Sequence, residues 1–350
     1  MARRPPTSAD HPDRMHARTL AEVGERTWLH KLQRLLDAQH AAPGSALLRG
    51  IGDDAAVLRV AGHDPRLVVS TDALIEDVHF RRATISMRDL GHKALAVNLS
   101  DLAAMGATPL GYLMTTVLSR GTPDDWIAGF ARGLAEDQRA FNLTVLGGDT
   151  AATPGPTCLS LTILGTVAPG AVLTRVGARP VDDIWVSGTI GDGALGLKVL
   201  RGEVPGDAAG HLARRYRLPE PRLALGRAIA GLAGAGMDVS DGLVQDLGHL
   251  CRAAGCGAVI DAGSVPLSDA ARHLVTGDAA LLRAVLTGGD DYGLLFVATP
   301  DSAGAVRAAA LLAGTPVTRI GRMVEGPPAV RVLDGEGTPI VLAQEGWSHF

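Results

Sequence analysis

The most restrictive feature of this sequence is a set of aspartates in short segments that also contain glycine, serine or threonine. These segments fall into five groups. The segments are Gly52-Asp53-Asp54, Ser70-Thr71-Asp72, Asn98-Leu99-Ser100-Asp101, Gly147-Gly148-Asp149 with Asp238-Val239-Ser240-Asp241, and Gly288-Gly289-Asp290-Asp291. We expect them at turns between strands and helices. Carboxylates repel one another at short range and are costly to bury, so a fold that gathers them needs a cation. Because Mg2+ prefers carboxylates together with substrate phosphates, the pattern predicts several ions bridging a polyphosphate.

Composition limits the classes of protein that fit. With 350 residues, 46% of them hydrophobic, the chain can form two cores of ordinary domain size. A net charge of -4 and the lack of a basic stripe argue against a nucleic-acid partner. No apolar run reaches the roughly 18 residues of a membrane span, and residues 1–13 do not resemble a signal peptide. Three cysteines without metal-ligand spacing fit a reducing compartment, so we expect a cytoplasmic protein.

The order of predicted elements indicates two α/β domains. Residues 1–19 are expected to be a disordered tail, 20–168 a first domain and 169–350 a second. An amphipathic helix is predicted over Leu20–His40. A stretch rich in proline and glycine, Pro169–Asp183, is predicted to link the domains.

Two elements of the first domain are predicted to bring carboxylates together. A strand over Leu67–Ser70 would present Asp72 just beyond its end. A helix over Ser86–Met105 would place Asn98 and Asp101 on one face, since residues three apart are neighbours on a helix. Asp101 can therefore point where Asp72 points.

The other predicted elements alternate between strand and helix. In the first domain they are Ala55–Val60, Leu110–Leu118, Pro123–Asn142, Leu143–Leu146 and Cys158–Val167. In the second they are Ile184–Ser187, Gly193–Arg201, Arg222–Gly234, Ala235–Val239, Gly242–Ala254, Ala258–Asp261, Gly293–Ala298, Ser302–Ala313 and Val317–Ile320.

Each motif also has a purely structural interpretation. Gly52-Asp53-Asp54 is compatible with a simple turn, and Asp238 to Asp241 with the cap of a helix. A lone histidine such as His79 is more often hydrogen-bonded structure than a ligand. Neither a Gly-Lys-Ser/Thr phosphate loop nor a convincing Gly-x-Gly-x-x-Gly is present; the stretch from Gly188 to Gly193 comes nearest. Joint occurrence of the aspartate segments favours a cleft for metals and phosphate.

Segments spread over Gly50–Phe350 match one family pattern in unbroken order. They are Gly50–Val57, Ser70-Thr71-Asp72 with His79-Phe80, Lys93–Ala107, Gly147–Thr150, Leu173-Thr174-Arg175, Ser240–Leu243 and Gly346–Phe350. The run from Asn98 to Ala107 is highly specific. These segments resemble the thiamine-monophosphate kinase family, in the superfamily of aminoimidazole-ribonucleotide synthetase and selenophosphate synthetase.

The resemblance implies a two-domain PurM-like fold of the α/β (α+β) class. Its N-terminal domain would form a barrel-like dimer core with a second copy, giving a homodimer, and ATP would lie between the domains. The implied magnesium ligands are Asp54, Ser70, Thr71, Asp72, Asp101, Asp149, Asp238 and Asp241. The implied ATP contacts are Gly148, Asp149, Arg175 and Ser240, and the implied contacts to thiamine monophosphate are His79, Asp290 and Trp347.

The implied activity is ATP-dependent phosphorylation of thiamine monophosphate to thiamine diphosphate. Transfer would be direct and in line, assisted by several Mg2+ ions and without a protein nucleophile. Alternatives are another ATP-using synthetase of the superfamily, or a non-catalytic nucleotide-binding assembly protein. The chain departs from the family at Gly288–Gly293, where Gly-Gly-Asp-Asp-Tyr-Gly replaces Gly-Gly-Glu-Asp-Tyr-Glu. Asp290 is therefore either a substrate contact or the cap of a turn before the next strand.

Overall fold

Two six-stranded mixed sheets with flanking helices form the fold. The computed structural model describes residues 47–49, 53–60, 64–207 and 210–348, so the predicted tail and the helix Leu20–His40 lie outside the described residues. Both sheets belong to one compact unit, Ala41–Trp347. We call the described residues up to Val167 the N-terminal half and those from Asp183 the C-terminal half.

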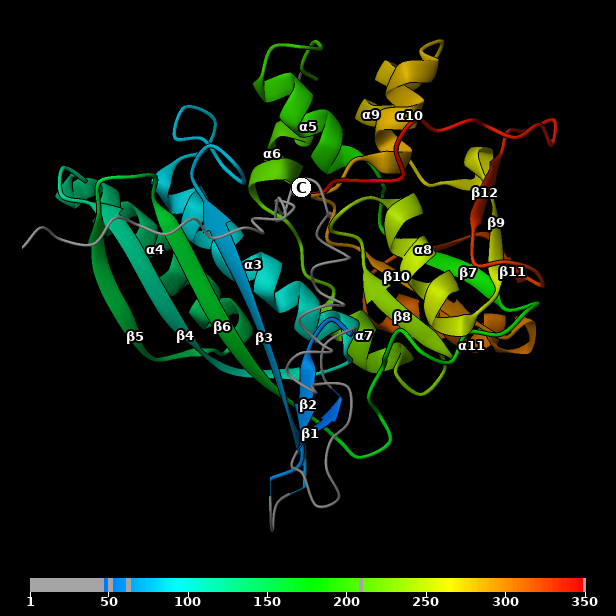
Figure 1. Cartoon of the computed structure of the whole chain (residues 1–350), viewed down its shortest axis with the longest axis horizontal. Coiled ribbons are helices and arrows are strands. Elements are labelled where there is room, and N and C mark those ends of the chain that lie inside the picture. The colour runs from blue at the N-terminus through cyan, green and yellow to red at the C-terminus, as the bar shows by residue number, and fades with distance from the viewer. Residues whose placement is uncertain (1–46, 50–52, 61–63, 208–209, 349–350) are drawn as a thin grey trace, which may run out of the picture. The chain divides into compact units, whose positions relative to one another are not determined.

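The first sheet has the strand order β1-β2-β3-β6-β4-β5. Figure 1 shows β3, β6, β4 and β5 side by side, with α3 and α4 behind them. Its elements are β1 (Leu47–Arg49), β2 (Ala56–Leu58), β3 (Arg66–Ile75), α3 (Met87–Ala104), β4 (Thr108–Ser119), α4 (Asp124–Phe141), β5 (Thr144–Thr153) and β6 (Cys158–Val167). Neighbouring strands are antiparallel except β4 and β5, which are parallel because α4 returns the chain between them.

The second sheet has the order β12-β9-β11-β7-β10-β8. Its elements are β7 (Asp183–Ser187), α5 (Asp192–Leu200), α6 (His211–Arg217), α7 (Leu223–Ile229), β8 (Ala235–Asp238), α8 (Leu243–Ala254), β9 (Gly257–Asp261), α9 (Asp269–Val275), α10 (Ala279–Thr287), β10 (Leu294–Ala298), α11 (Ala303–Leu312), β11 (Val317–Val324) and β12 (Val330–Leu333), with short 3-10 turns at Ala262–Ser264 and Pro300–Ser302. Every residue of β7, β8 and β10 is buried, which explains why their sequences are apolar apart from Asp183, Ser187 and Asp238 at strand ends.

Helix α3 is central to the fold. Its N-terminus is capped by Ser86, whose hydroxyl accepts a hydrogen bond from the backbone N–H of Asp89 at 3.1 Å. Along its length α3 is buried on nearly every side, because β3, β6 and α4 pack against it and α7 and β8 contact it from the C-terminal half. Polar side chains on this helix are therefore forced to find partners inside the protein.

Most predicted elements are confirmed, and Cys158–Val167 is confirmed residue for residue. Three strand predictions are clearly too short, and one of them is β11, which continues past Ile320 to Val324. β3 continues through Thr71 and Asp72 to Ile75 because it pairs with β6 along its whole length, and β5 continues through Gly147-Gly148-Asp149 beside β4. The expectation that the aspartates lie at strand-to-helix turns is thus wrong for Asp72 and Asp149, which lie inside strands, whereas Asp101 lies on α3, where the predicted helix places it. In the described part of the chain, no helix combines the length and apolarity that crossing a bilayer requires.

Candidate active site

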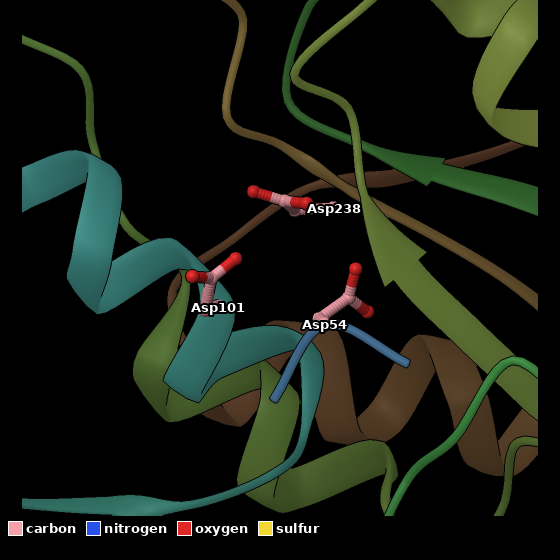
Figure 2. A group of neighbouring side chains, drawn as sticks. All are labelled: Asp54, Asp101 and Asp238. Carbon is pink, nitrogen blue, oxygen red and sulfur yellow. The ribbon is translucent and has the colours of Figure 1, made fainter. Parts of the chain in front are cut away.

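Three of the predicted carboxylates converge in the structure. One oxygen from each of Asp54, Asp101 and Asp238 lies within 4.8 Å of the other two, and we call these residues the aspartate cluster. Figure 2 shows Asp101 on helix α3, Asp54 on the short segment before β2, and Asp238 at the end of strand β8. The cluster therefore unites segments from both halves of the chain.

Neighbouring hydroxyl groups fix two of these carboxylates. The Ser100 hydroxyl donates to Asp238 Oδ2 at 2.6 Å, so helix α3 orients a carboxylate of the C-terminal half. The Ser70 hydroxyl lies 2.5 Å from Asp101 Oδ2 and 3.0 Å from the backbone carbonyl oxygen of Asp54. These contacts pre-organise the cluster before any ligand binds.

Burial raises the pKa values of several carboxylates in this region. Desolvation, followed by the charges of neighbouring aspartates, raises the pKa of Asp101. Desolvation raises that of Asp238 to about 7, with the charge of Asp54 adding to it. The pKa of Asp72 rises to about 6 for the same first reason, and the charge of Asp241 is the next cause. The charge of Asp72 in turn raises the pKa values of Asp101 and Asp238, so Asp72 is electrostatically linked to the aspartate cluster and Asp241 is linked to Asp72.

The aspartate cluster fits a divalent cation. Asp54 is buried, and its Oδ2 has no hydrogen-bond partner among the described residues, whereas its Oδ1 pairs with the Arg175 guanidinium. A buried carboxylate oxygen without a partner is costly unless something cationic occupies the space beside it. Hard cations such as Mg2+ bind oxygen ligands of this kind.

The predicted residues on β3 and β5 are placed differently. Ser70 and Asp72 face the cluster side of β3, while the Thr71 hydroxyl donates to the Leu161 carbonyl at 2.9 Å, so only the backbone of Thr71 is available to a ligand on the cluster side. Asp149 is exposed on β5 and accepts from the backbone N–H of Thr150 at 2.8 Å. Asp149 is not a member of the aspartate cluster.

Three of the residues predicted to contact ATP are Gly148, Arg175 and Ser240, and each is held in place by close backbone packing or by hydrogen bonds to aspartates. A Cβ atom on Gly148 would lie 1.8 Å from the Met114 carbonyl oxygen, so only glycine fits there. The backbone N–H of Arg175 donates to Asp53 Oδ1 at 2.7 Å, which adds to the guanidinium contact with Asp54. The backbone N–H of Ser240 donates to Asp246 Oδ2 at 3.1 Å.

Asp246 is a site residue that the sequence analysis missed. Its buried carboxylate also accepts from the backbone N–H groups of Asp241 and Gly242, at 3.1 and 3.2 Å, so one oxygen shapes the whole turn after β8. Burial raises the pKa of Asp246. A carboxylate four residues after a Ser-Asp-Gly turn, on the apolar side of helix α8, was the available signal.

The predicted substrate contacts have distinct surroundings. His79 Nδ1 accepts from the backbone N–H of Ile75 at 3.0 Å, and its carbonyl accepts from the Tyr216 hydroxyl at 3.2 Å, so both its ring and its backbone are held in place. Trp347 is 52% exposed, so it is not a core anchor. Its backbone N–H donates to the Asp241 carbonyl at 2.9 Å, next to the turn after β8.

Asp290 does not cap the turn before β10. Its carboxylate instead accepts from Lys93 Nζ at 2.8 Å, a contact between the two halves of the chain. Lys93 begins the segment Lys93–Ala107, and the family resemblance implies no role for it. The missed signal was a lysine followed directly by the apolar run Ala94–Val97 of the helix.

A cavity of about 720 Å³ lies elsewhere in the C-terminal half, beside the α5–α6 connection and α9. His211, Ser268 and His273 are among the residues that line it. Among the described residues that form its wall, there is no predicted site residue. The aspartate cluster therefore lies outside this cavity.

Comparison with known proteins agrees with this fold. Residues 52–167 match the N-terminal domain and residues 179–333 the C-terminal domain of the AIR synthase related proteins. Thiamine-monophosphate kinase of Escherichia coli O157:H7 is 42% identical over 308 residues, covering 86% of this chain and 91% of the relative. The Caulobacter vibrioides enzyme of that name is 42% identical over 301 residues, covering 85% and 84%.

Solved structures give the same result. AaThiL complexed with AMPPCP and TMP superposes with a TM-score of 0.82 at 29% identity, covering 96% of this chain and all 100% of that one. Thiamine-monophosphate kinase from Stenotrophomonas maltophilia has a TM-score of 0.73 at 38% identity, covering 89% and 96%. The chain therefore belongs to the thiamine-monophosphate kinase family, within the AIR synthase related proteins.

Proposed function

We propose that this chain transfers the terminal phosphoryl group of ATP to the phosphate of thiamine monophosphate, yielding ADP and thiamine diphosphate. The observation that carries the proposal is the aspartate cluster, with its buried, unpaired Asp54 oxygen. Such a group of carboxylates suits divalent cations bound to the phosphates of a nucleotide. The AMPPCP and TMP in the similar AaThiL structure support the choice of donor and acceptor.

Several Mg2+ ions would be held by the aspartate cluster together with Asp72, Asp149 and Asp241, assisted by Ser70 and the backbone of Thr71. When bound, Mg2+ neutralises phosphate charge and aligns the oxygens of donor and acceptor. The chain itself keeps Asp101 and Asp238 in place through the hydroxyls of Ser70 and Ser100. No protein nucleophile is needed, because the acceptor phosphate is already ionised and positioning supplies most of the rate in direct, in-line transfer.

The two substrates would meet different groups. Gly148, Arg175 and Ser240 would contact ATP, since Gly148 allows close approach of the backbone and Arg175 supplies a cation beside the cluster. His79, Asp290 and Trp347 would contact thiamine monophosphate. The half-exposed indole of Trp347 offers a face for the heteroaromatic rings.

We further infer that the chain acts as a cytoplasmic homodimer whose N-terminal halves pair through their sheets. Strand β5 is at the edge of the first sheet and is exposed at every residue except Thr153. Leu113, Val145 and Leu146 on β4 and β5 are 43%, 46% and 52% exposed. An apolar edge of this kind is normally covered by a partner, and a second copy would close it into a barrel-like core.

The test is an assay of purified protein with ATP, Mg2+ and thiamine monophosphate, in which ADP and thiamine diphosphate are both measured. We expect equal amounts of the two products, none with thiamine as acceptor, and none when EDTA removes the metal. ADP formation that does not depend on thiamine monophosphate, or phosphorylation of thiamine itself, would contradict the proposal.

A further inference from the structure

Lys93 is a buried cation held between the two halves of the chain. It lies on α3 with its side chain 1% exposed, among the most deeply buried large side chains of the described residues. Its Nζ donates to Asp290 Oδ1 at 2.8 Å and lies 3.7 Å from the ring centre of Tyr216 on α6. An ammonium group is retained in such a place only with partners of this quality, so Lys93 is bound to the C-terminal half by charge and by a cation–π contact.

The backbone of Asp290 is fixed independently of Lys93. Asp290 has a left-handed φ of 69°, and its N–H donates to the Ser240 carbonyl at 2.9 Å. A Cβ atom on Gly193 would lie 2.3 Å from the Asp290 carbonyl oxygen, so the chain on that side approaches as closely as glycine permits. Because these contacts hold the backbone, the side-chain torsions are the main freedom left to Asp290.

Lys93 removes that remaining freedom. The Asp290 side chain is 30% exposed, so part of the carboxylate is bound by Lys93 and part is open to solvent. The Tyr292 hydroxyl lies 3.4 Å from the same Oδ1, which leaves Oδ2 as the more available oxygen. The ion pair therefore presents one carboxylate oxygen outward in a defined direction.

The pair also has a defined distance from the aspartate cluster. Lys93 and Ser100 are seven residues apart on α3, which is two helical turns, or about 10 Å along the axis. Ser100 orients Asp238 of the cluster, and Lys93 orients Asp290. One helix face thus sets the spacing between the cluster, where phosphates would bind, and the Asp290 carboxylate.

We propose that Lys93 is a positioning residue for the phosphoryl acceptor, acting by fixing Asp290 toward the acceptor's cationic ring. This inference rests on the proposed function. A carboxylate would repel the acceptor's phosphate, so the attractive contact is with the positively charged thiazolium ring at the other end of the molecule. Lys93 thereby helps to orient the acceptor with its ring at Asp290 and its phosphate at the aspartate cluster.

The test compares Lys93→Met, Asp290→Asn and the double variant with wild type. We expect Lys93→Met to raise the Michaelis constant for thiamine monophosphate about 10-fold or more while that for ATP changes by less than about 2-fold. Calorimetric titration with thiamine monophosphate alone should show a matching loss of affinity. Because Lys93 acts through Asp290, the double variant should be no weaker than the worse single variant.

Arg88→Met is the matched control. Arg88 lies on the same helix and pairs with Glu136 of α4 at 2.6 Å, on the exposed side, so its loss should change neither Michaelis constant. Lys93→Gln keeps an amide donor for Asp290 and should give an intermediate constant for thiamine monophosphate. Lys93→Gln also takes the place of Lys93→Met in this test if thermal melting shows that Lys93→Met does not fold.

Different results separate this inference from the proposed function. A wild-type protein that makes no thiamine diphosphate would overturn the proposed function. An active wild type would overturn the role of Lys93 if the variants left the constant for thiamine monophosphate unchanged or raised both constants equally. The role of Lys93 would also be overturned if the double variant raised the Michaelis constant for thiamine monophosphate by the product of the two single effects, because the two residues would then act independently.

Discussion

Individual carboxylates of the site differ because their immediate partners differ. Asp54 pairs with a guanidinium, whereas Asp101 and Asp238 are held by serine hydroxyls. A hydroxyl hydrogen-bonds a carboxylate but brings no opposite charge, so the charges of Asp101 and Asp238 are left for a bound cation to offset. We therefore expect substitutions at these positions to act on metal binding more than on folding.

Asp101→Asn tests this expectation. The amide keeps the shape of the side chain but removes a charge that burial disfavours, so the melting temperature in EDTA should stay unchanged or rise. Turnover should fall about 100-fold or more, because a metal ligand is lost. Asp89→Asn, at the exposed start of the same helix, is the control and should remain active. Near-normal turnover of Asp101→Asn at saturating Mg2+ would remove this residue from the ligand set.

Trp347→Ala tests the acceptor contact. Because the indole is 52% exposed, its loss should lower the melting temperature little. The Michaelis constant for thiamine monophosphate should rise by about 5-fold or more, since stacking on a heteroaromatic ring is lost, with the ATP constant almost unchanged. Steady-state kinetics with each substrate varied in turn make the comparison. An equal rise in both constants would argue against stacking.

At the scale of whole elements, the sequence predicts interiors better than ends. Strand Cys158–Val167 and helix α3 were predictable because apolar periodicity and the Ser86 cap are local signals. The continuation of β3 and β5 through their polar segments was not, since pairing with β6 and β4 extends them across residues that favour turns.

The missed elements have the same explanation. Strands β1 and β12 are short edge strands, and helices α6 and α9 each span only seven residues, so none carries enough periodicity to be recognised. Helix α10 follows a clear cap, Asp278, but its sequence is too short and too apolar to distinguish from a strand.

For the site, the aspartates were predictable from their glycine and serine neighbours, whereas Lys93 and Asp246 act through partners distant in sequence or on the backbone.

The exposed strand β5 yields a prediction about assembly. Leu146→Lys should weaken the proposed homodimer, because it places a charge in an apolar surface that a second copy would bury. Light scattering coupled to gel filtration should show a shift toward monomer at micromolar protein. Leu312→Lys is the control, since Leu312 is 90% exposed on α11 in the C-terminal half, and it should not change the mass. A wild-type monomer, or a dimer insensitive to Leu146→Lys, would contradict pairing through this edge.

For the molecule as a whole, the buried carboxylates couple stability to pH. The folded-state pKa values of Asp72 and Asp238 are raised to about 6 and about 7, above the ordinary value of 3.8. At pH values between 3.8 and the raised pKa of each group, the folded state therefore binds more protons than the unfolded state. Their contribution to the free energy of unfolding is favourable at low pH and is lost as pH rises through about 7. Asp291, also raised to about 7 by burial, acts in the same direction.

We accordingly expect the melting temperature in EDTA to fall as pH is raised from about 5 to about 8. Mg2+ should raise it, and by more at the higher pH, because the metal binds the ionised carboxylates and offsets their repulsion. Differential scanning fluorimetry at several pH values, with EDTA and with Mg2+, measures both effects. A Mg2+ effect that is independent of pH would show that the aspartate cluster does not bind the ion.

The hydrogen bond between Ser100 and Asp238 also has a consequence during protein synthesis. These residues are 138 positions apart, and Lys93 and Asp290 are 197 positions apart. At about 5–20 residues per second, the ribosome needs roughly 7 to 28 seconds to make the chain between Ser100 and Asp238. During that interval the side of α3 that later contacts α7 and β8 has no partner from the C-terminal half. We expect the nascent N-terminal half to present this apolar helix to chaperones until translation of β8 allows it to be covered.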